Sequence, residues 1–405
     1  MSEEPSTLEV ARELAVPTPS KIVLLVIDGL GGLPHPVTGL TELETAALPN
    51  LDRLARRSDA GLTVPLLPGV TVGSGPGHLA LFGYDPWRFR IGRGATSALG
   101  VGFPLQPGDV AARINFATVD GRGVVLDRRA GRIGSEEGER LCHLLDTVRV
   151  EGIESRVMLE KGHRAVVVFR GDGLSDRLAD SDPQREGLPL RPVRALVPEA
   201  EQTAEAVNRW IERATKALRV GSVANAVLLR GFAGLPSVPR MAEVYRLRAA
   251  ALCIYPTYEG VARALGMDVL PAGDGLESQL DSLATHFDRY DFFYLHVKGT
   301  DSAGEDGLFE EKVRLLEAVD AVVPRIETLK PEVLAVGGDH STPSAYREHT
   351  WHPVPFLMSS RWALPGLAQR FTERECARGS LGTFPALRAM LLMMAHGGKL
   401  AKFGN

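Results

Sequence analysis

The segment that most constrains the fold of this chain is a short apolar run near its start that ends in an acid. Residues 21–28 read Lys-Ile-Val-Leu-Leu-Val-Ile-Asp, and a glycine follows. A continuous apolar run of this length indicates a strand buried on both faces, as in the parallel sheets of α/β proteins. Asp28 would then lie at the carboxyl end of a central strand, where open α/β sheets bind their ligands.

The same pattern returns twice in the second half of the chain. Residues 291–298 form an apolar run just before Asp301, and residues 332–340 form another that ends in Asp339-His340. Helical patterns lie between the strands, at residues 48–60 and 308–329. This alternation predicts an α/β fold with a doubly wound, mostly parallel sheet.

The middle of the chain has a different texture, with strand-like segments at residues 113–119 and 164–169 around an arginine-rich turn. A length of 405 residues exceeds one ordinary hydrophobic core, at roughly 150 residues per domain. Two Pro- and Gly-rich stretches, 104–108 and 231–239, are typical of hinges. We therefore expect a discontinuous core and an inserted smaller α+β domain, with the following bounds: core 1–105 and 240–405, insert 106–239.

Composition excludes several classes of protein. An apolar fraction of 44% with 24% charged residues is typical of a globular chain, and a net charge of -4 gives no attraction to nucleic acid or anionic lipid. The longest apolar stretches are far shorter than the roughly 20 residues needed to cross a bilayer, so no membrane insertion is expected. The acidic start is unlike a signal peptide, which favours a cytoplasmic location. Three widely spaced cysteines indicate free thiols.

Candidate metal ligands gather after the last predicted strand. Asp339 and His340 are adjacent, and His349 follows within ten residues. A single histidine in such a place is more often structural, but Asp28 and Asp301 at the ends of other strands reverse that balance. Carboxylates and neutral imidazoles suit manganese, zinc or magnesium. Two such ions, about 3.5–4 Å apart, stabilise both the attacking and the leaving oxygen of a phosphoryl transfer.

A glycine-rich loop, residues 68–78, surrounds a single serine, Ser74, and an apolar helix follows. A serine at a helix N-terminus faces free N–H groups and a positive dipole, and a metal ion would lower its pKa enough to make it a nucleophile. The alternative is a flexible turn in which Ser74 is only the N-cap of the helix.

The middle domain carries a basic set. Guanidinium groups bind carboxylate and phosphate oxygens in pairs, so such a set is suited to a small anion with two charged groups. The alternative is a solvated face of salt bridges. The candidate substrate-binding residues are Arg113, Asp127, Arg128, Arg129, Arg132, His163 and Arg164, together with Lys298 beside the predicted metal ligands.

Ten motifs together resemble one known family over nearly the whole chain. They are residues 25–32 (LVIDGLGG), 45–52 (TAALPNLD), 78–86 (HLALFGYDP), 92–94 (GRG), 113–120 (RINFATVD), 127–133 (DRRAGRI), 228–231 (LLRG), 266–269 (GMDV), 296–301 (HVKGTD) and 338–343 (GDHSTP). The sequence resembles the archaeal-type, 2,3-bisphosphoglycerate-independent phosphoglycerate mutases of the alkaline phosphatase superfamily.

The resemblance implies that Ser74 takes the phosphoryl group from 3-phosphoglycerate and returns it to the 2-hydroxyl of the retained glycerate, with no need for 2,3-bisphosphoglycerate. It implies two divalent ions, typically Mn²⁺, with Mg²⁺ or Co²⁺ in some members. One ion would be held by Asp28, Ser74, Asp339 and His340, and the other by Asp301 and His349. The insert would be the substrate domain, with Arg113, Arg128, Arg129 and Arg132 near the glycerate.

Three positions depart from the family pattern. Glu305 replaces a histidine ligand of the second ion and still offers an oxygen to it, which favours harder metals. Glu259 stands where a lysine near the phosphate is expected, and Lys298 would have to compensate. Gly75-Pro76 follows Ser74 in place of Asp-Thr.

Two rival functions stay open at this point. A metal-dependent phosphatase or another phosphomutase would use the same fold and metals, since a metal-bound serine passes its phosphoryl group to whichever acceptor is held in line. A non-catalytic metal-binding relative would explain the acids at Glu259 and Glu305. The sequence leaves the oligomeric state undetermined.

Overall fold

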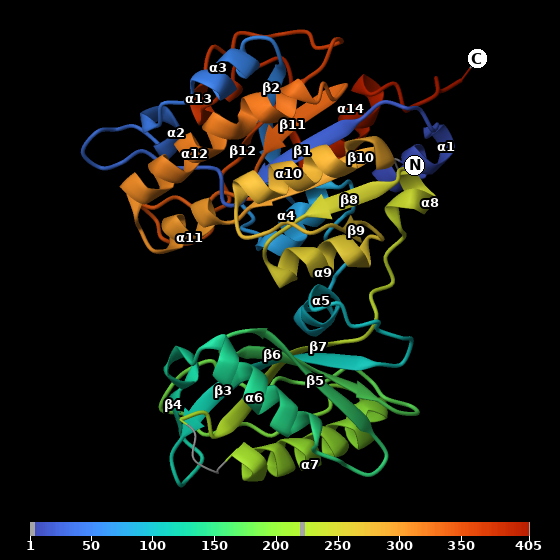
Figure 1. Ribbon diagram of the computed structural model, residues 1–405, viewed down its shortest axis with the longest axis vertical. Helices are drawn as coiled ribbons and strands as arrows, with labels where there is room; N and C mark the ends of the chain where they lie inside the picture. Colours follow the sequence, from blue (N-terminus) through green and yellow to red (C-terminus); the bar gives the residue numbers. More distant parts are fainter. Residues whose placement is uncertain (1–4, 219–222, 405) are drawn as a thin grey trace. The chain divides into compact units, whose positions relative to one another are not determined.

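The computed structural model describes residues 5–218 and 223–404, and the chain divides into two compact units. Unit 1 comprises Met1–Arg90, Val238–Tyr255 and Leu265–Asn405, and unit 2 comprises Ile91–Ser237 and Pro256–Ala264. Both units mix helices with strands (Figure 1). Each unit is described below by itself.

Unit 1 contains the apolar runs that the sequence singles out. Its elements are α1 (Thr7–Leu14), β1 (Ile22–Ile27), α2 (Glu42–Thr45), α3 (Pro49–Ala55), β2 (Asp59–Val64), α4 (Ser74–Leu81), α8 (Met241–Tyr245), β8 (Ala249–Leu252), β9 (Asp268–Val269), α10 (Leu276–His286), η3 (Phe287–Arg289), β10 (Phe292–Val297), α11 (Gly299–Glu305), α12 (Phe309–Thr328), β11 (Val333–Gly337), β12 (Val354–Ser359), α13 (Glu373–Cys376), β13 (Gly382–Pro385), η4 (Ala386–Arg388) and α14 (Ala389–His396).

In the described part of unit 1 the strands form one eight-stranded sheet, in the order β13-β2-β12-β11-β1-β10-β8-β9. Strand β1 lies between β10 and β11 and is parallel to both, and β8 and β9 continue the parallel half. Only β12 runs against its neighbours among these strands. All six residues of β1 are buried, as expected for a strand covered on both faces. The predicted mostly parallel α/β sheet is confirmed.

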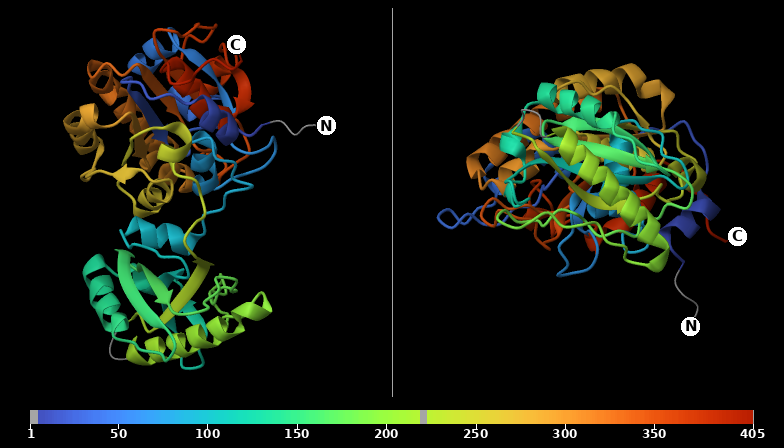
Figure 2. Two further views of the ribbon diagram at one scale, coloured as in Figure 1. Left: turned by 90° about the vertical axis from the view of Figure 1, so that its right-hand side faces the viewer. Right: turned by 90° about the horizontal axis from the view of Figure 1, so that it is seen from below.

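Helices cover both faces of this sheet. Val23, Leu25 and Ile27 of β1 share one core cluster with residues of α3, α10 and α12. Because side chains alternate along a strand, the other face carries Tyr294 of β10, which packs edge-on against Phe82 at the end of α4. Residue Ala15, after α1, pairs with Leu400, after α14, so these two segments lie side by side (Figure 2). The doubly wound arrangement follows from this coverage.

One predicted helix is shorter than expected. The pattern at 48–60 predicts a single helix, but α3 ends at Ala55 and β2 begins at Asp59. The residues from Asp59 onward pair with β12 and are mostly buried, so the sheet, rather than the local pattern, decides their conformation. The predicted helix at 308–329 agrees with α12 to within one residue at each end.

Unit 2 is built on an antiparallel sheet of five strands within its described residues, with β6 and β7 both paired to the long strand β3. Helices α6 and α7 pack on one face of this sheet, and α5 packs on the other. Its elements are α5 (Arg93–Gly100), β3 (Val110–Val119), β4 (Val125–Asp127), η1 (Ala130–Arg132), α6 (Ser135–Asp146), β5 (Glu154–Lys161), β6 (Arg164–Arg170), η2 (Pro198–Ala200), α7 (Glu201–Leu218), β7 (Ala226–Ala233) and α9 (Pro256–Ala264).

The bounds of unit 2 differ from the expected insert 106–239 at two places. Helix α5 lies in unit 2 although residues up to 105 were expected in the core, and α9 joins it from much later in the chain. The two helices touch backbone to backbone through glycines. A Cβ on Gly260 would lie 1.9 Å from the carbonyl oxygen of Thr96, and a Cβ on Gly100 would lie 2.1 Å from that of Pro256. No local sequence pattern predicts such a contact between distant segments.

Among residues 5–218 and 223–404, no helix combines the length and apolar character needed to span a bilayer. The three cysteines lie within these residues, and all three are buried and outside disulfides.

Candidate active site

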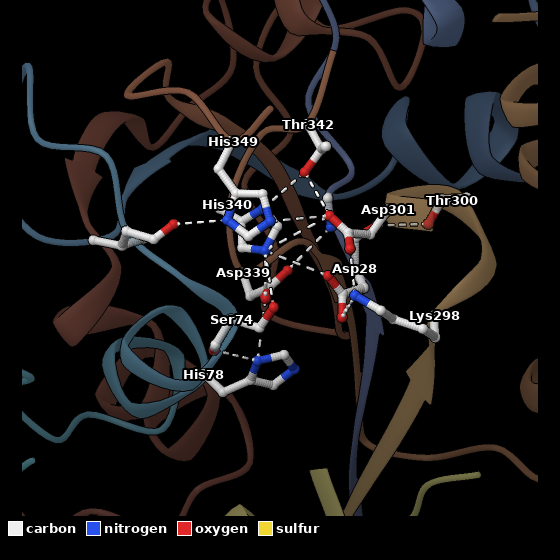
Figure 3. A network of polar contacts seen from close by, with 12 residues as sticks. Asp28, Ser74, His78, Lys298, Thr300, Asp301, Asp339, His340, Thr342 and His349 are labelled. Carbon is white, nitrogen blue, oxygen red and sulfur yellow. Dashed lines mark hydrogen bonds and ion pairs between the residues drawn. The ribbon is translucent and has the colours of Figure 1, made fainter. Parts of the chain in front are cut away.

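The candidate metal ligands gather at one edge of the unit 1 sheet. Asp28 follows β1 directly, Asp301 lies in α11 after β10, and Asp339 and His340 follow β11. Because these three strands are neighbours and parallel, their carboxyl ends bring the side chains together (Figure 3). Asp28, Asp339 and His340 are almost completely buried.

The ligand atoms form two overlapping groups that share His340. Asp28, Asp339 and His340 form one group, and Asp301, His340 and His349 form the other, with the ligand atoms of each group within 4.8 Å of one another. The Nε2 atom of His340 lies 3.4 Å from Oδ1 of Asp28 and 3.2 Å from Oδ2 of Asp339. The rings of His340 and His349 stack with their centroids 3.7 Å apart.

The chemistry of this cluster fits a divalent cation. Oδ1 of Asp28 and Oδ2 of Asp339 are buried and accept no hydrogen bond from a described residue. A buried carboxylate oxygen without a hydrogen bond is costly unless a cation compensates it. Three buried carboxylates beside two imidazoles are therefore a donor set suited to manganese, magnesium or zinc.

Glu305 lies at the margin of this cluster. Its Oε1 is 3.6 Å from Nε2 of His349, and its side chain is 54% exposed. It belongs to neither of the two compact ligand groups among the described residues. For Glu305 to act as a ligand, its side chain would have to move toward Asp301 and His349.

Ser74 is the first residue of α4, and Gly73, rather than Ser74, is the N-cap. Its Oγ lies 3.1 Å from Nε2 of His340. A Cβ placed on Gly73 or Gly75 would meet no atom within 4 Å, so the backbone on either side of Ser74 is uncrowded. The free N–H groups and the dipole of α4 favour negative charge at this position.

Two histidines behind the ligands were not singled out from the sequence. His296 contacts Oδ2 of Asp28 at 2.9 Å through Nε2, and His78 contacts Oδ2 of Asp339 at 3.2 Å through Nδ1. Nδ1 of His78 also lies 2.7 Å from the carbonyl oxygen of Ser74. Burial lowers the pKa of His296. For His78, burial also acts to lower the pKa, but Asp339, Asp28 and the carbonyl of Ser74 together outweigh it, and the net shift is upward. The sequence offers one indication of these residues: His78 begins the motif 78–86, and His296 begins the motif 296–301.

Lys298, predicted to bind substrate, contacts ligand carboxylates in this structure. Its ammonium donates to Oδ2 of Asp301 and lies 3.4 Å from Oδ2 of Asp28. Burial lowers the pKa of Lys298. The carboxylates around it, chiefly Asp28 and Asp301, together raise the pKa by more than burial lowers it, so the net shift is upward. Lys298 thus supplies positive charge at the edge of the cluster.

The pKa shifts of Asp301 and His349 have their cause in the pairing of acids with cationic side chains in this cluster. For Asp301, burial opposes ionisation, but hydrogen bonding to His349 and the charge of Lys298 hold the pKa well below its usual range. For His349, burial lowers the pKa, but hydrogen bonds to Asp301 and Glu305 raise it to about 10. A protonated His349 thus balances the acids, and a metal ion would replace that proton.

The arginine set lies in unit 2, and two of its members are already paired. Arg113 binds Glu160 through two hydrogen bonds of 3.0 and 2.6 Å. Arg128 binds the buried Asp182 in the same bidentate manner, at 3.1 and 2.6 Å. Such paired guanidiniums are held in fixed orientation.

The remaining predicted arginines, Arg129, Arg132 and Arg164, form no ion pair with a described acid. Asp127 shapes the turn that carries the first two, since it accepts the backbone N–H groups of Arg129 at 2.7 Å and Gly131 at 2.6 Å. These hydrogen bonds lower the pKa of Asp127. The turn lines a hollow of about 610 Å³. Asp127 therefore stabilises the conformation of the turn.

His163 lies among these cations. Burial, and then the charges of Arg164, Arg129 and Arg132, lower its pKa to about 4, so it is neutral near pH 7. Arg230, which was quoted only within a motif, belongs to the same cationic group. Burial and the charge of Arg113 lower its pKa to about 10, and its Nε is buried without a hydrogen bond. This concentration of positive charge is suited to an anion.

Glu259, which stands where a lysine is expected in the family, lies in α9 of unit 2. Its carboxylate pairs with Arg263 at 2.9 Å, one helical turn away. Arg263 in turn donates to the carbonyl oxygens of Leu99 and Gly100 at the end of α5. Glu259 therefore takes part in the contact between the two helices.

Comparisons with known proteins agree on one family. A family model described as 2,3-bisphosphoglycerate-independent phosphoglycerate mutase matches residues 55–223. A probable 2,3-bisphosphoglycerate-independent phosphoglycerate mutase of Thermus thermophilus is 51% identical over 400 residues, which cover 98% of each chain. The protein of the same description from Thermotoga neapolitana is 49% identical over 394 residues, 97% of this chain and 98% of the relative.

Solved structures point the same way. A Pyrococcus horikoshii protein has a TM-score of 0.83 at 29% identity, covering 95% of this chain and 99% of its own. The cofactor-independent phosphoglycerate mutase of Thermoplasma acidophilum has a TM-score of 0.71 at 30% identity, covering 94% and 100%. With half of its residues shared along nearly its entire length, this chain belongs to the 2,3-bisphosphoglycerate-independent phosphoglycerate mutase family.

Proposed function

We propose that this protein interconverts 3-phosphoglycerate and 2-phosphoglycerate through a phosphoserine formed on Ser74. The observation that carries the proposal is the position of the Ser74 hydroxyl, at the N-terminus of α4 and 3.1 Å from Nε2 of His340. The nucleophile thereby lies beside the buried carboxylates that fit a divalent cation.

Two sets of residues would hold the cations, for which manganese is the proposed metal. Asp28, Ser74, Asp339 and His340 form the first set, and Asp301 and His349, with Glu305 at the margin, form the second. The metal, when bound, lowers the pKa of the serine hydroxyl and neutralises charge on the transferring phosphoryl group.

The protein residues then have separate tasks. The Oγ of Ser74 bonds to phosphorus while the bond from phosphorus to the 3-oxygen of glycerate breaks, and in the second step the 2-oxygen displaces Ser74. In sum, the Ser74 proton is transferred to the 3-oxygen and the 2-hydroxyl proton to Ser74, so no further reactant is needed. The N–H groups of α4 and the ammonium of Lys298 stabilise the phosphoryl oxygens.

The cations of unit 2 would bind the anionic substrate. Arg129, Arg132 and Arg164 form no salt bridge with an acid among the described residues, although the charge of Glu160 acts on Arg164, so these guanidiniums can bind a carboxylate or phosphate. Arg113 and Arg128 are held in place by Glu160 and Asp182. A neutral His163 would accept a hydrogen bond from a glycerate hydroxyl.

The test is conversion of 3-phosphoglycerate by chelator-stripped protein, with Mn²⁺ added back and 2,3-bisphosphoglycerate absent. We expect metal-dependent formation of 2-phosphoglycerate and a phosphopeptide containing Ser74 in rapidly quenched samples. Ser74→Ala should lose both, by about 10³-fold or more in rate. Ser302→Ala, which removes an exposed serine next to Asp301, is the matched control and should keep both.

Other outcomes have defined meanings. Stoichiometric release of inorganic phosphate in place of 2-phosphoglycerate would indicate a phosphatase that uses the same serine. Absence of any phosphorylated Ser74 with bound Mn²⁺ would indicate a non-catalytic relative.

A further inference from the structure

A completely buried lysine lies beneath the candidate metal ligands. Lys312 of α12 has no solvent exposure, and its Nζ donates three hydrogen bonds to backbone carbonyl oxygens. The acceptors are Gly29 at 2.9 Å, Gly31 at 3.1 Å and Thr342 at 2.9 Å. An ammonium has three N–H bonds, so these carbonyls use its full donor capacity.

The three carbonyls belong to the two loops that carry metal ligands. Gly29 and Gly31 follow Asp28, and Thr342 lies two residues after His340. The loops touch directly, because a Cβ on Gly31 would lie 1.9 Å from Oγ of Ser341. The N–H of Gly29 also donates to Oδ1 of Asp339 at 3.1 Å. Lys312 thus spans the boundary between the Asp28 loop and the His340 loop.

The charge of Lys312 is only loosely compensated. Burial lowers its pKa, and the charge of Glu42 opposes that shift. Oε1 of Glu42 lies 3.9 Å from Nζ and accepts the N–H of Ser344 at 2.8 Å instead. Burying an ammonium is costly, so a buried lysine is retained where its hydrogen bonds hold something in place.

We propose that Lys312 is a positioning residue of the metal centre, which fixes the Asp28 loop and the His340 loop at the separation that a shared cation requires. It touches neither substrate nor reacting atoms. The inference rests on the metal centre of the proposed function. Groups that orient metal ligands typically change metal affinity by about 10- to 100-fold when they are removed.

The chain offers a matched control for the loss of a buried lysine. Lys399, also in unit 1, is 1% exposed, and its Nζ donates to the carbonyl oxygen of Thr18 at 2.7 Å and to its Oγ1 at 3.2 Å. It contacts no candidate ligand loop. Lys312→Met and Lys399→Met therefore remove the same buried group at two places, and only the first should alter metal binding.

The experiment measures Mn²⁺ dissociation constants by electron paramagnetic resonance of free Mn²⁺, alongside thermal unfolding of each metal-free protein. We expect the constant to rise by about 10- to 100-fold in Lys312→Met and to stay within about twofold in Lys399→Met, whatever each loses in melting temperature. Lys312→Gln, whose amide still donates two hydrogen bonds, should show a smaller rise.

Unchanged Mn²⁺ affinity in folded Lys312→Met would overturn the proposal, as would an equal loss in Lys399→Met. If Lys312→Met fails to fold, Lys312→Gln is measured in its place, and failure of both while Lys399→Met folds would also overturn a role limited to positioning. Absence of Mn²⁺ binding by the unmodified protein would instead contradict the proposed function.

Discussion

The imidazole of His340 stacks on that of His349 at 3.7 Å between ring centroids, and its Nε2 lies 3.1 Å from Oγ of Ser74. The same nitrogen is within 3.4 Å of carboxylate oxygens from Asp28 and Asp339. His340 thus belongs to both candidate ligand groups and also contacts Ser74, the proposed nucleophile. A cation bound at either group would act within reach of Ser74.

Metal binding is expected to release protons. The pKa of His349 in the metal-free protein is raised to about 10, so at pH 8 its ring is protonated and must lose that proton to bind a metal. Mn²⁺ affinity should therefore rise with pH up to about 10. Calorimetry in buffers of different ionisation enthalpy should detect about one proton released, and His349→Gln should remove that release. The same proton count in both proteins would contradict the assignment.

The same shift has a consequence for the metal-free protein. Because the pKa of His349 is raised from 6.5, its contribution to stability is complete below pH 6.5 and is lost as the pH rises toward 10. The difference in unfolding free energy between unmodified protein and His349→Gln should shrink across that window.

Glu305→Gln tests the departure from the family pattern. The carboxylate of Glu305 contributes to the raised pKa of His349, and its Oε1 lies 3.6 Å from Nε2 of His349. Its loss should lower Mn²⁺ affinity by on the order of tenfold. Equilibrium dialysis measures this, with Glu310→Gln, an exposed acid at the start of α12, as control. Equal affinities in the two variants would show that Glu305 acts only at the surface.

His163 should titrate far below an ordinary histidine. Its pKa is lowered to about 4, so between pH 6.5 and 4 the unfolded chain binds the proton more readily and stability falls as the pH falls. Imidazole NMR signals measure this pKa directly. Arg132→Gln should raise it by removing a neighbouring cation, and added 3-phosphoglycerate should raise it more. A midpoint near 6.5 in the free protein would refute the cationic surroundings described here.

Gly260→Ala should destabilise unit 2. Alanine normally favours a helix over glycine by up to about 1 kcal/mol. Here its Cβ would lie 1.9 Å from the carbonyl oxygen of Thr96, and forcing the two backbones apart costs about 1–3 kcal/mol. The clash should prevail. Gly121→Ala, where a Cβ meets nothing within 4 Å, should change the unfolding free energy by less than about 0.5 kcal/mol in chemical denaturation.

The sequence was informative where one local pattern decides the structure. The apolar runs before Asp28, Asp301 and Asp339 predicted buried parallel strands, and those strands form the centre of the sheet. Since parallel neighbours end at one edge, the proximity of the acids followed from topology alone. The glycines around Ser74 likewise predicted the N-terminus of a helix, one residue away from the observed cap.

What the sequence did not predict depends on contacts between distant segments. His78 and His296 lie more than two hundred residues apart, yet their ring centroids are 5.2 Å apart behind the ligands. Lys312 appears in the sequence as one charge in an amphipathic helix, and only the packing of α12 shows that it is buried. Arg128 stays a predicted substrate-binding residue, and its pairing with Asp182 is a long-range contact that no spacing in the sequence reveals.

The glycine contact between α5 and α9 has a consequence for how this protein could be divided. Unit 2 is completed by nine residues, Pro256–Ala264, that the chain reaches only after it has returned to unit 1. No single continuous fragment therefore contains unit 2 without part of unit 1. A fragment of residues 91–237 would leave the surface of α5 around Gly100 uncovered, so a stable isolated unit would need α9 reattached by a designed linker.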